Sequence, residues 1–578
     1  MLEALLPRIG EYKKETIKTP LYMMGEVGLE CIIPMVMAAL IDQMYSQDML
    51  VIIKYGAILI VLATLSLICG SKSAKTAATA STGFAKNLRR DLFYKVQDFS
   101  FGDIDRFSSS SLVTRLTNDV SQLQMAFQMI IRMAVRSPLM IIFSVIMALR
   151  INARMAMIFF AIIPILAVGL ILIFNVAHPI FSRIFKKYDA LNNSVQENVA
   201  GIRVVKSFVR EDYETDKFHK ASEDVRSNFV KAERIVALNS PLMSLCMYLS
   251  MLLISYLGSK VIINSGATEL TTGQLSSLTN YGIQILTSLM MLSMVFLQIT
   301  FASEACERIV EVLDYESTLT SPSDGIKEVK DGSIKFEDVV FRYGGSNKNA
   351  ALSDIDLDIK SGETIGIIGG TGSSKTTLIQ LIPRLYDVSE GRVLVGGVDV
   401  RDYDLKSLRD EVAVVLQKNV LFSGTIKDNL RWGNKNATDE EIVRVCKLAQ
   451  ADDFIEQMPD KYDTMLSQGG TNVSGGQKQR LCIARALLKK PKILILDDST
   501  SAVDTRTDAL IRKAFDTEIP DTTKIIIAQR VASVENADQI LVMDNGKIVE
   551  QGNHDTLMKL NGIYREIYDS QTKMKGDK

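Results

Sequence analysis

At 578 residues the chain is too long for a single ordinary hydrophobic core, so two or more domains are expected. The formal net charge of −1 gives no electrostatic support for a nucleic-acid partner. Six cysteines occur without CxxC spacing, so the sequence predicts neither a zinc site nor a disulfide framework. Apolar stretches crowd into the first 305 residues, whereas the remainder has the composition of a soluble α/β domain.

The N-terminal part contains segments long and apolar enough to cross a membrane, which takes about 20 residues in a helix. The predicted spans are roughly 20–42, 50–71, 133–149, 155–177, 240–260 and 275–303. They form a predicted transmembrane domain over residues 19–315, in contact with membrane lipids and followed by a linker at 316–332. Residues 1–18 mix leucine with lysine, which suits either a helix lying on the membrane surface or a frayed tail.

Lysine and arginine are distributed unevenly between the predicted spans. They are numerous in the long segments at about 79–132 and 180–238, and absent from the short turns at 43–49 and 262–274. Segments rich in Lys and Arg stay on the cytoplasmic side of a membrane. We therefore expect a multi-pass protein of the inner or plasma membrane, with both long segments and everything after residue 305 in the cytoplasm.

Two groups of residues within the spans leave alternatives open. Glu26 and Glu30 lie one helical turn apart, hence on one face, and exposing them to lipid would be costly. They are interpreted either as a contact for a cation- or proton-sensitive substrate or as solvated groups near an aqueous opening. Met243, Met247 and Met251 recur at helical spacing, which is typical of helix packing or of an adaptable apolar substrate surface.

From Ser333 onward, short β-branched runs alternate with helical segments, which predicts an α/β domain over residues 333–578. Residues 334–337 and 355–358 alternate as half-exposed strands do. Residues 364–368 and 493–496 are continuous apolar runs, as in buried parallel strands. The predicted fold class is therefore an all-α membrane domain fused to a C-terminal α/β domain.

A phosphate-binding loop directly follows the first buried strand. Its residues are Gly369, Gly370, Thr371, Gly372, Ser373, Ser374, Lys375, Thr376 and Thr377. The backbone N–H groups of such a loop and of the following helix form a cradle for anions. Lys375 is expected to reach the β- and γ-phosphates of ATP or GTP, and Thr376 to bind Mg²⁺. Ser374 stands where this loop normally has glycine, so an unusual backbone is expected there.

Further segments along the chain match motifs that a P-loop alone does not predict. The stretch Asn472–Arg480 includes Ser474, Gly475, Gly476 and Gln477, and it resembles the signature motif of ATP-binding cassette (ABC) proteins. Gln417 matches the Q-loop of that family, and Ser501-Ala502-Val503-Asp504 matches the D-loop. Tyr343 matches the aromatic residue that stacks on adenine.

This resemblance assigns roles to the matching residues. It implies that Tyr343, the P-loop, Gln417 and Asp504 contribute to ATP binding. It also implies that Thr376, Gln417 and Asp497 hold Mg²⁺. In the family each ATP lies between the P-loop of one chain and the signature motif of the other, so Ser474 to Gln477 would serve the partner's ATP.

The membrane half shows the same resemblance. Arg115–Val120 and Glu197–Phe208 resemble the first and second cytoplasmic loops of ABC exporters. With six spans ahead of a cassette, the chain resembles a bacterial type IV, multidrug-type half-transporter, which implies export of small amphipathic compounds. The resemblance also implies a short coupling helix near 100–110 and another near 210–216, the second contacting the partner's cassette.

Two residues depart from the family pattern of a hydrolytic site. Asp498 follows Asp497 where the family has glutamate as general base, and Gln529 stands where it has a histidine. Aspartate is one methylene shorter, and a base must come within about 3 Å of the proton that it takes. Glutamine donates a hydrogen bond but cannot become cationic. We therefore expect a site that holds ATP and hydrolyses it slowly.

The unaltered signature residues predict a heterodimer. The chain would keep a slow site of its own and lend a complete signature motif to a partner half-transporter. That partner should carry the glutamate and the histidine, and its own signature motif should be damaged. The alternatives are a homodimer that turns over slowly, a lipid or glycolipid flippase, and a nucleotide sensor that transports nothing.

Overall fold

The structure, a computed structural model, describes residues 5–44, 48–344, 349–499 and 503–576. The chain forms two units. The first comprises Met1–Gln97 and Ser110–Tyr315, and the second comprises Asp98–Ser109 and Glu316–Lys578. The segment Asp98–Ser109, which lies between two membrane helices in the sequence, therefore packs with the C-terminal domain.

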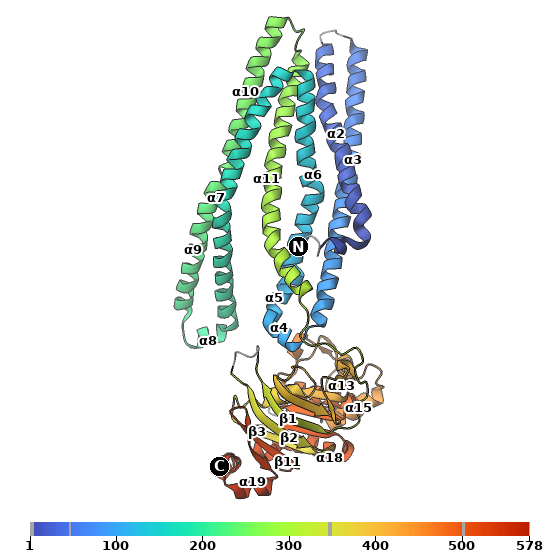
Figure 1. The fold of residues 1–578 in the computed structure, drawn as a ribbon, viewed down its shortest axis with the longest axis vertical. Helices are drawn as coiled ribbons and strands as arrows, with labels where there is room; N and C mark the ends of the chain where they lie inside the picture. Colours follow the sequence, from blue (N-terminus) through green and yellow to red (C-terminus); the bar gives the residue numbers. More distant parts are fainter. Residues whose placement is uncertain (1–4, 45–47, 345–348, 500–502, 577–578) are drawn as a thin grey trace. The chain divides into compact units, whose positions relative to one another are not determined.

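In its described residues, the first unit consists of helices joined by short turns (Figure 1). Its elements are η1 (Leu6–Tyr12), α2 (Lys13–Gln43), α3 (Met49–Gln97), α5 (Ser109–Thr114), the π-helical turn η3 (Arg115–Asp119), α6 (Val120–Ile151), α7 (Ala153–Ala200), α8 (Ile202–Ser207), α9 (Glu211–Val236), α10 (Asn239–Ser265) and α11 (Thr272–Asp314). Among the described residues, six helical stretches are long and apolar enough to span a membrane. The predicted six-helix membrane fold is confirmed.

The helices extend well beyond the predicted spans. The segments 79–132 and 180–238 are largely helical, because α3, α7 and α9 continue through them. Neither segment contains proline, and charged residues are compatible with a helix once it has left the apolar layer. Of the predicted short helices, the first corresponds to α4 (Phe101–Phe107).

The second predicted short helix is displaced in sequence. It is α8, at Ile202–Ser207, whereas the predicted position 210–216 is the first part of α9. Helix α7 ends at Ala200 with Gly201 as its C-cap, and Val209 adopts a left-handed φ of 51° just before α9 begins. These two backbone positions set the turn, and the family resemblance did not reveal them.

The N-terminal segment, predicted as a helix over 1–18, is described from residue 5 and consists of the 3-10 helix η1 followed by the start of α2. Gly10 has φ 52° and ψ −125°, which breaks the helical path, and Lys13 already belongs to α2. The backbone at Gly10 lies against α3, where a Cβ would come within 2.9 Å of Asn87 Nδ2. Asn87 donates a hydrogen bond to the Arg8 carbonyl over 3.1 Å, so the segment is fixed to α3.

Glu26 and Glu30 both pair with one arginine of a neighbouring helix. Arg136 of α6 donates to Glu26 Oε1 and to Glu30 Oε2, each over 2.7 Å. Glu26 is 9% exposed. One guanidinium therefore compensates two carboxylates within the membrane helices and ties α2 to α6, as intramembrane charges require. The sequence did not identify this counter-charge, and both sequence interpretations remain predictions.

The exporter-like segment Arg115–Asp119 joins the start of α6 to the end of α11. Arg308 donates to both carboxylate oxygens of Asp119 over 2.8 and 2.6 Å. Arg115 donates to Glu311 over 2.8 Å and to the Arg308 carbonyl over 2.9 Å. Asp119 and Arg115 are both buried, so the two pairs form a firm connection between these helices.

The second unit contains three sheets. A four-stranded sheet has the order β2-β1-β4-β5, a six-stranded sheet has the order β12-β11-β3-β10-β9-β6, and a two-stranded sheet pairs β7 with β8. The strands are β1 (Ile334–Phe341), β2 (Leu352–Ile359), β3 (Thr364–Gly369), β4 (Glu390–Val395), β5 (Val398–Asp399), β6 (Val412–Val415), β7 (Gly424–Thr425), β8 (Met465–Leu466), β9 (Ile493–Asp497), β10 (Thr523–Ile527), β11 (Gln539–Asp544) and β12 (Lys547–Gly552). The four predicted strands are confirmed.

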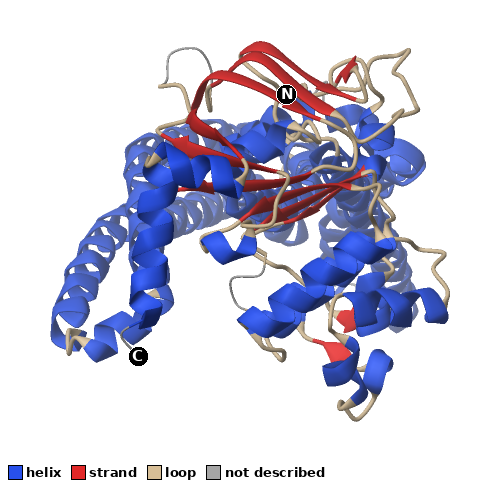
Figure 2. Cartoon of the chain, turned by 90° about the horizontal axis from the view of Figure 1, so that it is seen from below, coloured by secondary structure: helices blue, strands red, loops and turns tan. Residues whose placement is uncertain are grey.

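The six-stranded sheet is parallel except for β12, and helices or strands cover both faces. The helices are α12 (Lys375–Leu381), α13 (Leu405–Glu411), α14 (Ile426–Leu430), α15 (Asp439–Leu448), α16 (Asp452–Glu456), α17 (Gly475–Leu488), α18 (Thr505–Glu518), α19 (His554–Leu560) and α20 (Ile563–Gly576). One core joins this sheet to the four-stranded sheet and α12, and the other joins it to α14, α15, α17 and α18. Figure 2 shows the strands in these two layers. The predicted α/β fold is confirmed.

Candidate nucleotide site

The P-loop connects the carboxyl end of β3 to the first turn of α12, the edge at which parallel α/β sheets bind ligands. Gly369 is required there, because a Cβ would come within 2.2 Å of the Met543 carbonyl oxygen. Gly372 has φ +86°, and a Cβ on it would meet nothing within 4 Å, so space remains above the loop. Ser374 also has a positive φ, of 69°. The unusual backbone expected at Ser374 is confirmed.

Lys375 turns its ammonium group toward the P-loop. Its Nζ donates to the carbonyls of Gly369 and Gly370 over 2.9 and 2.7 Å. Burial lowers the pKa of Lys375, while the neighbouring Asp497 and Asp498 oppose that shift. An ammonium over a loop with open space above it fits the terminal phosphates of ATP.

Thr376 and Asp497 are adjacent, as expected for a shared Mg²⁺ site. Thr376 Oγ1 donates to Asp497 Oδ2 over 2.9 Å, and Asp497 is 2% exposed. Burial raises the pKa of Asp497. Within the described ranges, no group of three or more His, Cys, Asp or Glu residues is placed to hold a metal by itself. A hydroxyl and one carboxylate fit Mg²⁺ that takes its remaining ligands from phosphates and water.

The two residues that depart from the hydrolytic pattern bind each other. Gln529 Nε2 donates to Asp498 Oδ2 over 2.7 Å, and Gln417 Nε2 lies 3.5 Å from the same oxygen. Asp498 is 8% exposed and has a left-handed φ of 48°. Burial raises the pKa of Asp498, and the two amide hydrogen bonds counteract part of that effect. Gln417 thus directs its amide to Asp498.

A cavity of about 570 Å³ unites most of the predicted site. It is lined by Ile368, Gly369, Gly370, Thr371, Gly372, Ser374, Lys375, Thr376, Thr377, Gln417, Asp497, Asp498, Ile527, Gln529 and Ile567. Ser373 is not among these residues, because its hydroxyl donates to the Gly370 carbonyl over 2.9 Å and supports the loop from behind. The cavity therefore combines the phosphate cradle, the Mg²⁺ ligands and both altered residues.

Tyr343 lies beside this cavity, where its hydroxyl contacts two residues of α12. Its hydroxyl is 3.0 Å from Thr377 Oγ1, and it donates to Gln380 over 3.4 Å. The side chain is 38% exposed, which leaves one part of the ring open to a base. Its position next to Thr377 suits the predicted stacking on adenine.

Two residues of the C-terminal helix α20 belong to the site and were not identified from the sequence. Ile567 lines the cavity. Gln571 donates to the Gln529 carbonyl over 2.8 Å and accepts from the Val531 N–H over 2.9 Å. Because α20 lies almost forty residues after Gln529 and has no motif, only the fold brings them together. Gln571 fixes the backbone that carries Gln529.

The signature segment, Ser474 to Gln477, is separate from this cavity and begins the 14-residue helix α17. Ser474 Oγ accepts from the Gln477 N–H, and Gln477 Oε1 accepts from the Ser474 N–H over 2.9 Å. Ser474 and Gly475 are exposed. The predicted D-loop residue Asp504 caps α18, where hydrogen bonds from the Thr507 side chain and then from the Thr507 and Arg506 backbone lower its pKa. Ser501 and Ala502 lie outside the described residues.

Comparison with protein families identifies both parts of the chain. Residues 23–290 match the model of the ABC transporter transmembrane region, and residues 352–501 match the ABC transporter model. Over 97% of this chain and 98% of the other, the fold matches a bacterial Atm1-family ABC exporter with ATP bound, at a TM-score of 0.83 and 22% identity. At 22% identity, this similarity shows that the two proteins share a fold.

Curated relatives align with most of the chain. The ABC transporter ATP-binding protein YfiB of Bacillus subtilis is 38% identical over 550 residues, which is 95% of each chain. The ATP-dependent lipid A-core flippase of Desulfotalea psychrophila is 33% identical over 84% of each chain. The chain therefore belongs to the ABC transporter family and is a half-transporter of an ATP-driven exporter, a multi-span membrane protein with a C-terminal nucleotide-binding domain.

Proposed function

We propose that the chain is one half of a heterodimeric exporter whose own nucleotide site retains ATP. The hydrogen bond between Gln529 and Asp498 carries this proposal. An effective general base presents a carboxylate oxygen to the attacking water within about 3 Å. Here Asp498 Oδ2 instead accepts from one amide at 2.7 Å and faces a second at 3.5 Å. Neither amide can accept a proton in place of the missing histidine.

The side chains that would bind the phosphates and Mg²⁺ are retained. Lys375 would exchange the loop carbonyls for phosphate oxygens, and Thr376 and Asp497 would hold Mg²⁺, which neutralises charge on the phosphates when bound. Burial of Asp497 and Lys375 strengthens these interactions, because a partly dry site screens charge less than water does. The site thus favours holding ATP over hydrolysing it.

The signature segment supports the heterodimer. The first backbone N–H groups of α17 lack helical partners, and its exposed start offers an anion site to another chain. The reciprocal bonds of Ser474 and Gln477 hold that end in one conformation. A partner with the glutamate and the histidine would complete a hydrolytic site against this segment. ATP at that second site would drive each transport cycle.

The proposed substrates are small amphipathic, drug-like compounds, and a lipid is the second candidate. An apolar cavity of about 310 Å³ between α7 and α11 supports both, since it accepts a hydrocarbon group. Its lining includes Leu170, Phe174, Leu292 and Phe296, with Ser293 as a polar residue. A lipid is the second candidate because one relative is named as a lipid A-core flippase.

The test compares ATP hydrolysis by the chain alone with hydrolysis by the chain co-expressed with a half-transporter that carries the glutamate and the histidine. We expect the chain alone to bind ATP but to hydrolyse it at least about 100-fold more slowly than the pair, the range seen when electrostatic groups of a site are lost. Lys375→Ala serves as the control that removes binding. Rapid hydrolysis by the chain alone would refute the proposal.

A further inference from the structure

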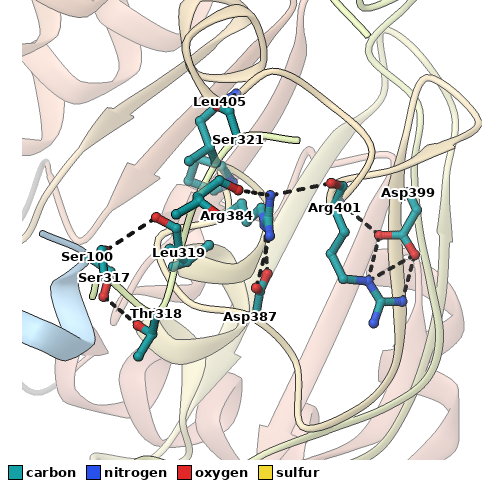
Figure 3. A network of polar contacts seen from close by, with 12 residues as sticks. Ser100, Ser317, Thr318, Leu319, Ser321, Arg384, Asp387, Asp399, Arg401 and Leu405 are labelled. Carbon is teal, nitrogen blue, oxygen red and sulfur yellow. Dashed lines mark hydrogen bonds and ion pairs between the residues drawn. The ribbon is translucent and has the colours of Figure 1, made fainter. Parts of the chain in front are cut away.

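A rigid turn follows the P-loop helix α12 and carries Tyr386. Arg384, which is buried and has a left-handed φ of 50°, donates to the carboxylate of Asp387 over 2.7 and 3.1 Å. Figure 3 shows the Arg384 guanidinium between Asp387 and Arg401. Its Nη1 donates to the carbonyls of Thr320 and Arg401, each over 3.4 Å. These bonds fix Tyr386 relative to α12.

The ring of Tyr386 lies between the adenine-stacking residue and helix α4. Its centroid is 5.3 Å from that of Tyr343, with the planes at 86°, and 5.6 Å from that of Phe341. On another side it is 6.1 Å from the ring of Phe101, the first residue of α4. These separations fall within the range of favourable edge-to-face aromatic contacts.

The hydroxyl of Tyr386 makes a separate connection to α4. It donates to Asp105 Oδ2 over 2.7 Å. Burial raises the pKa of Tyr386, so the hydroxyl remains protonated and acts as a donor. On its other side, α4 is held by Asp103, which accepts from Ser317 over 2.7 Å and from Thr318 Oγ1 over 2.9 Å.

Tyr343 is connected to the nucleotide cavity at the same time, through its contact with Thr377 of the P-loop. Successive contacts therefore connect the cavity through Tyr343 and Tyr386 to α4. In the amino-acid sequence, α4 lies in the loop between two membrane helices. Both the ring and the hydroxyl of Tyr386 reach α4, but only the ring contacts Tyr343 and only the hydroxyl bonds to Asp105. Their effects can be separated by substitution.

We propose that Tyr386 is a positioning residue with two roles. Its ring holds Tyr343 in place for stacking on adenine, and its hydroxyl transmits that state to α4 of the same chain. This inference rests on the proposed function, in which this site retains ATP. Retained ATP would then keep α4 in one position while the partner's site turns over.

The test uses the full chain in lipid nanodiscs with two probes, a Mg²⁺ complex of a non-hydrolysable ATP analogue and ribose triphosphate without a base. Hydrogen exchange of the peptide 98–109 measures the response of α4. In the wild type, the ATP analogue should slow this exchange and the base-free probe should not. Because the analogue is not hydrolysed, rapid ATPase activity would refute the slow site without changing this measurement.

Two variants separate the roles of Tyr386. Tyr386→Phe should bind the analogue within about twofold of the wild type but lose the protection of α4. Tyr386→Ala should bind it about fivefold or more weakly, the size expected when base stacking is lost, with no change for the base-free probe. Full protection in Tyr386→Phe, or wild-type affinity in Tyr386→Ala, would overturn the inference.

Tyr462→Phe provides a matched control. Tyr462 also donates to a carboxylate, Asp452, over 2.6 Å, and it lies in a different hydrophobic core from the one against which Tyr386 packs. Its substitution removes a similar hydrogen bond elsewhere in the same domain. It should leave both the affinity and the exchange of α4 unchanged, and a loss of α4 protection in this control as large as in Tyr386→Phe would contradict the assigned role.

Discussion

The P-loop site and the signature segment differ in how far each has departed from the family pattern. The P-loop site keeps Lys375, Thr376 and Asp497 around its cavity, while Gln529 and Asp498 bond to each other. The signature segment keeps its serine, both glycines and the reciprocal cap at the start of α17. One chain thus carries an altered half-site and an unaltered one. In the proposed function, this difference separates ATP retention at the P-loop site from support of hydrolysis by the signature segment.

The largest expected effect comes from a substitution in the signature segment, which is the unaltered half-site. Gly475→Asp places a carboxylate where the signature would meet a γ-phosphate, so we expect ATPase activity of the complex to fall by about 100-fold or more. Aspartate suits the first turn of a helix, so α17 should remain folded. Asp498→Asn is the comparison variant, and it should change the activity less than about twofold. Equal losses from both variants would remove the asymmetry.

Restoring the altered half should have a smaller effect on the complex. Asp498→Glu together with Gln529→His should raise its ATPase activity about tenfold, because a base and an imidazole return to the γ-phosphate. Each single change alters one partner of the bond between the two side chains and leaves the other departure from the family pattern in place. A double-mutant cycle should therefore give non-additive rates. Additive rates would show that Asp498 and Gln529 act independently.

The smallest expected effect concerns the backbone of the P-loop. Ser374 has φ 69°, a conformation that costs a residue with a side chain about 1–2 kcal/mol. Ser374→Gly should therefore raise the free energy of unfolding by about 1 kcal/mol, with little change in hydrolysis. Ser373→Gly is the control, since it removes a hydrogen bond to Gly370 and should destabilise the protein. The thermal midpoints of both variants check this, and a lower midpoint for Ser374→Gly would contradict it.

Much of the fold follows from short-range sequence patterns. The apolar runs of β3 and β9 and the P-loop between β3 and α12 are local features, and the structure has them at the expected residues. The left-handed backbone at Ser374 was also predictable, because glycine is the usual residue there. Helix positions were less predictable where a single backbone angle decides the turn, as at Val209 before α9.

Long-range contacts were not predictable from the sequence. Glu26 and Glu30 find their counter-charge in Arg136, which lies more than one hundred residues away at the edge of another predicted span. Gln571 reaches the Gln529 backbone from a helix without a motif. The bond between Gln529 and Asp498 arises because β9 and β10 are parallel neighbours that end at the same edge. Such contacts depend on how strands and helices are packed, which no single segment encodes.

The most direct test of the central claim is to ask whether this chain keeps intact ATP while the complex hydrolyses ATP. The complex is loaded with a photoreactive ATP labelled on its γ-phosphate, chased with unlabelled ATP for many turnovers, cross-linked and separated by chain. The account predicts that the γ-label remains on this chain and disappears from its partner. Loss of the label from both chains at the rate of turnover would contradict it.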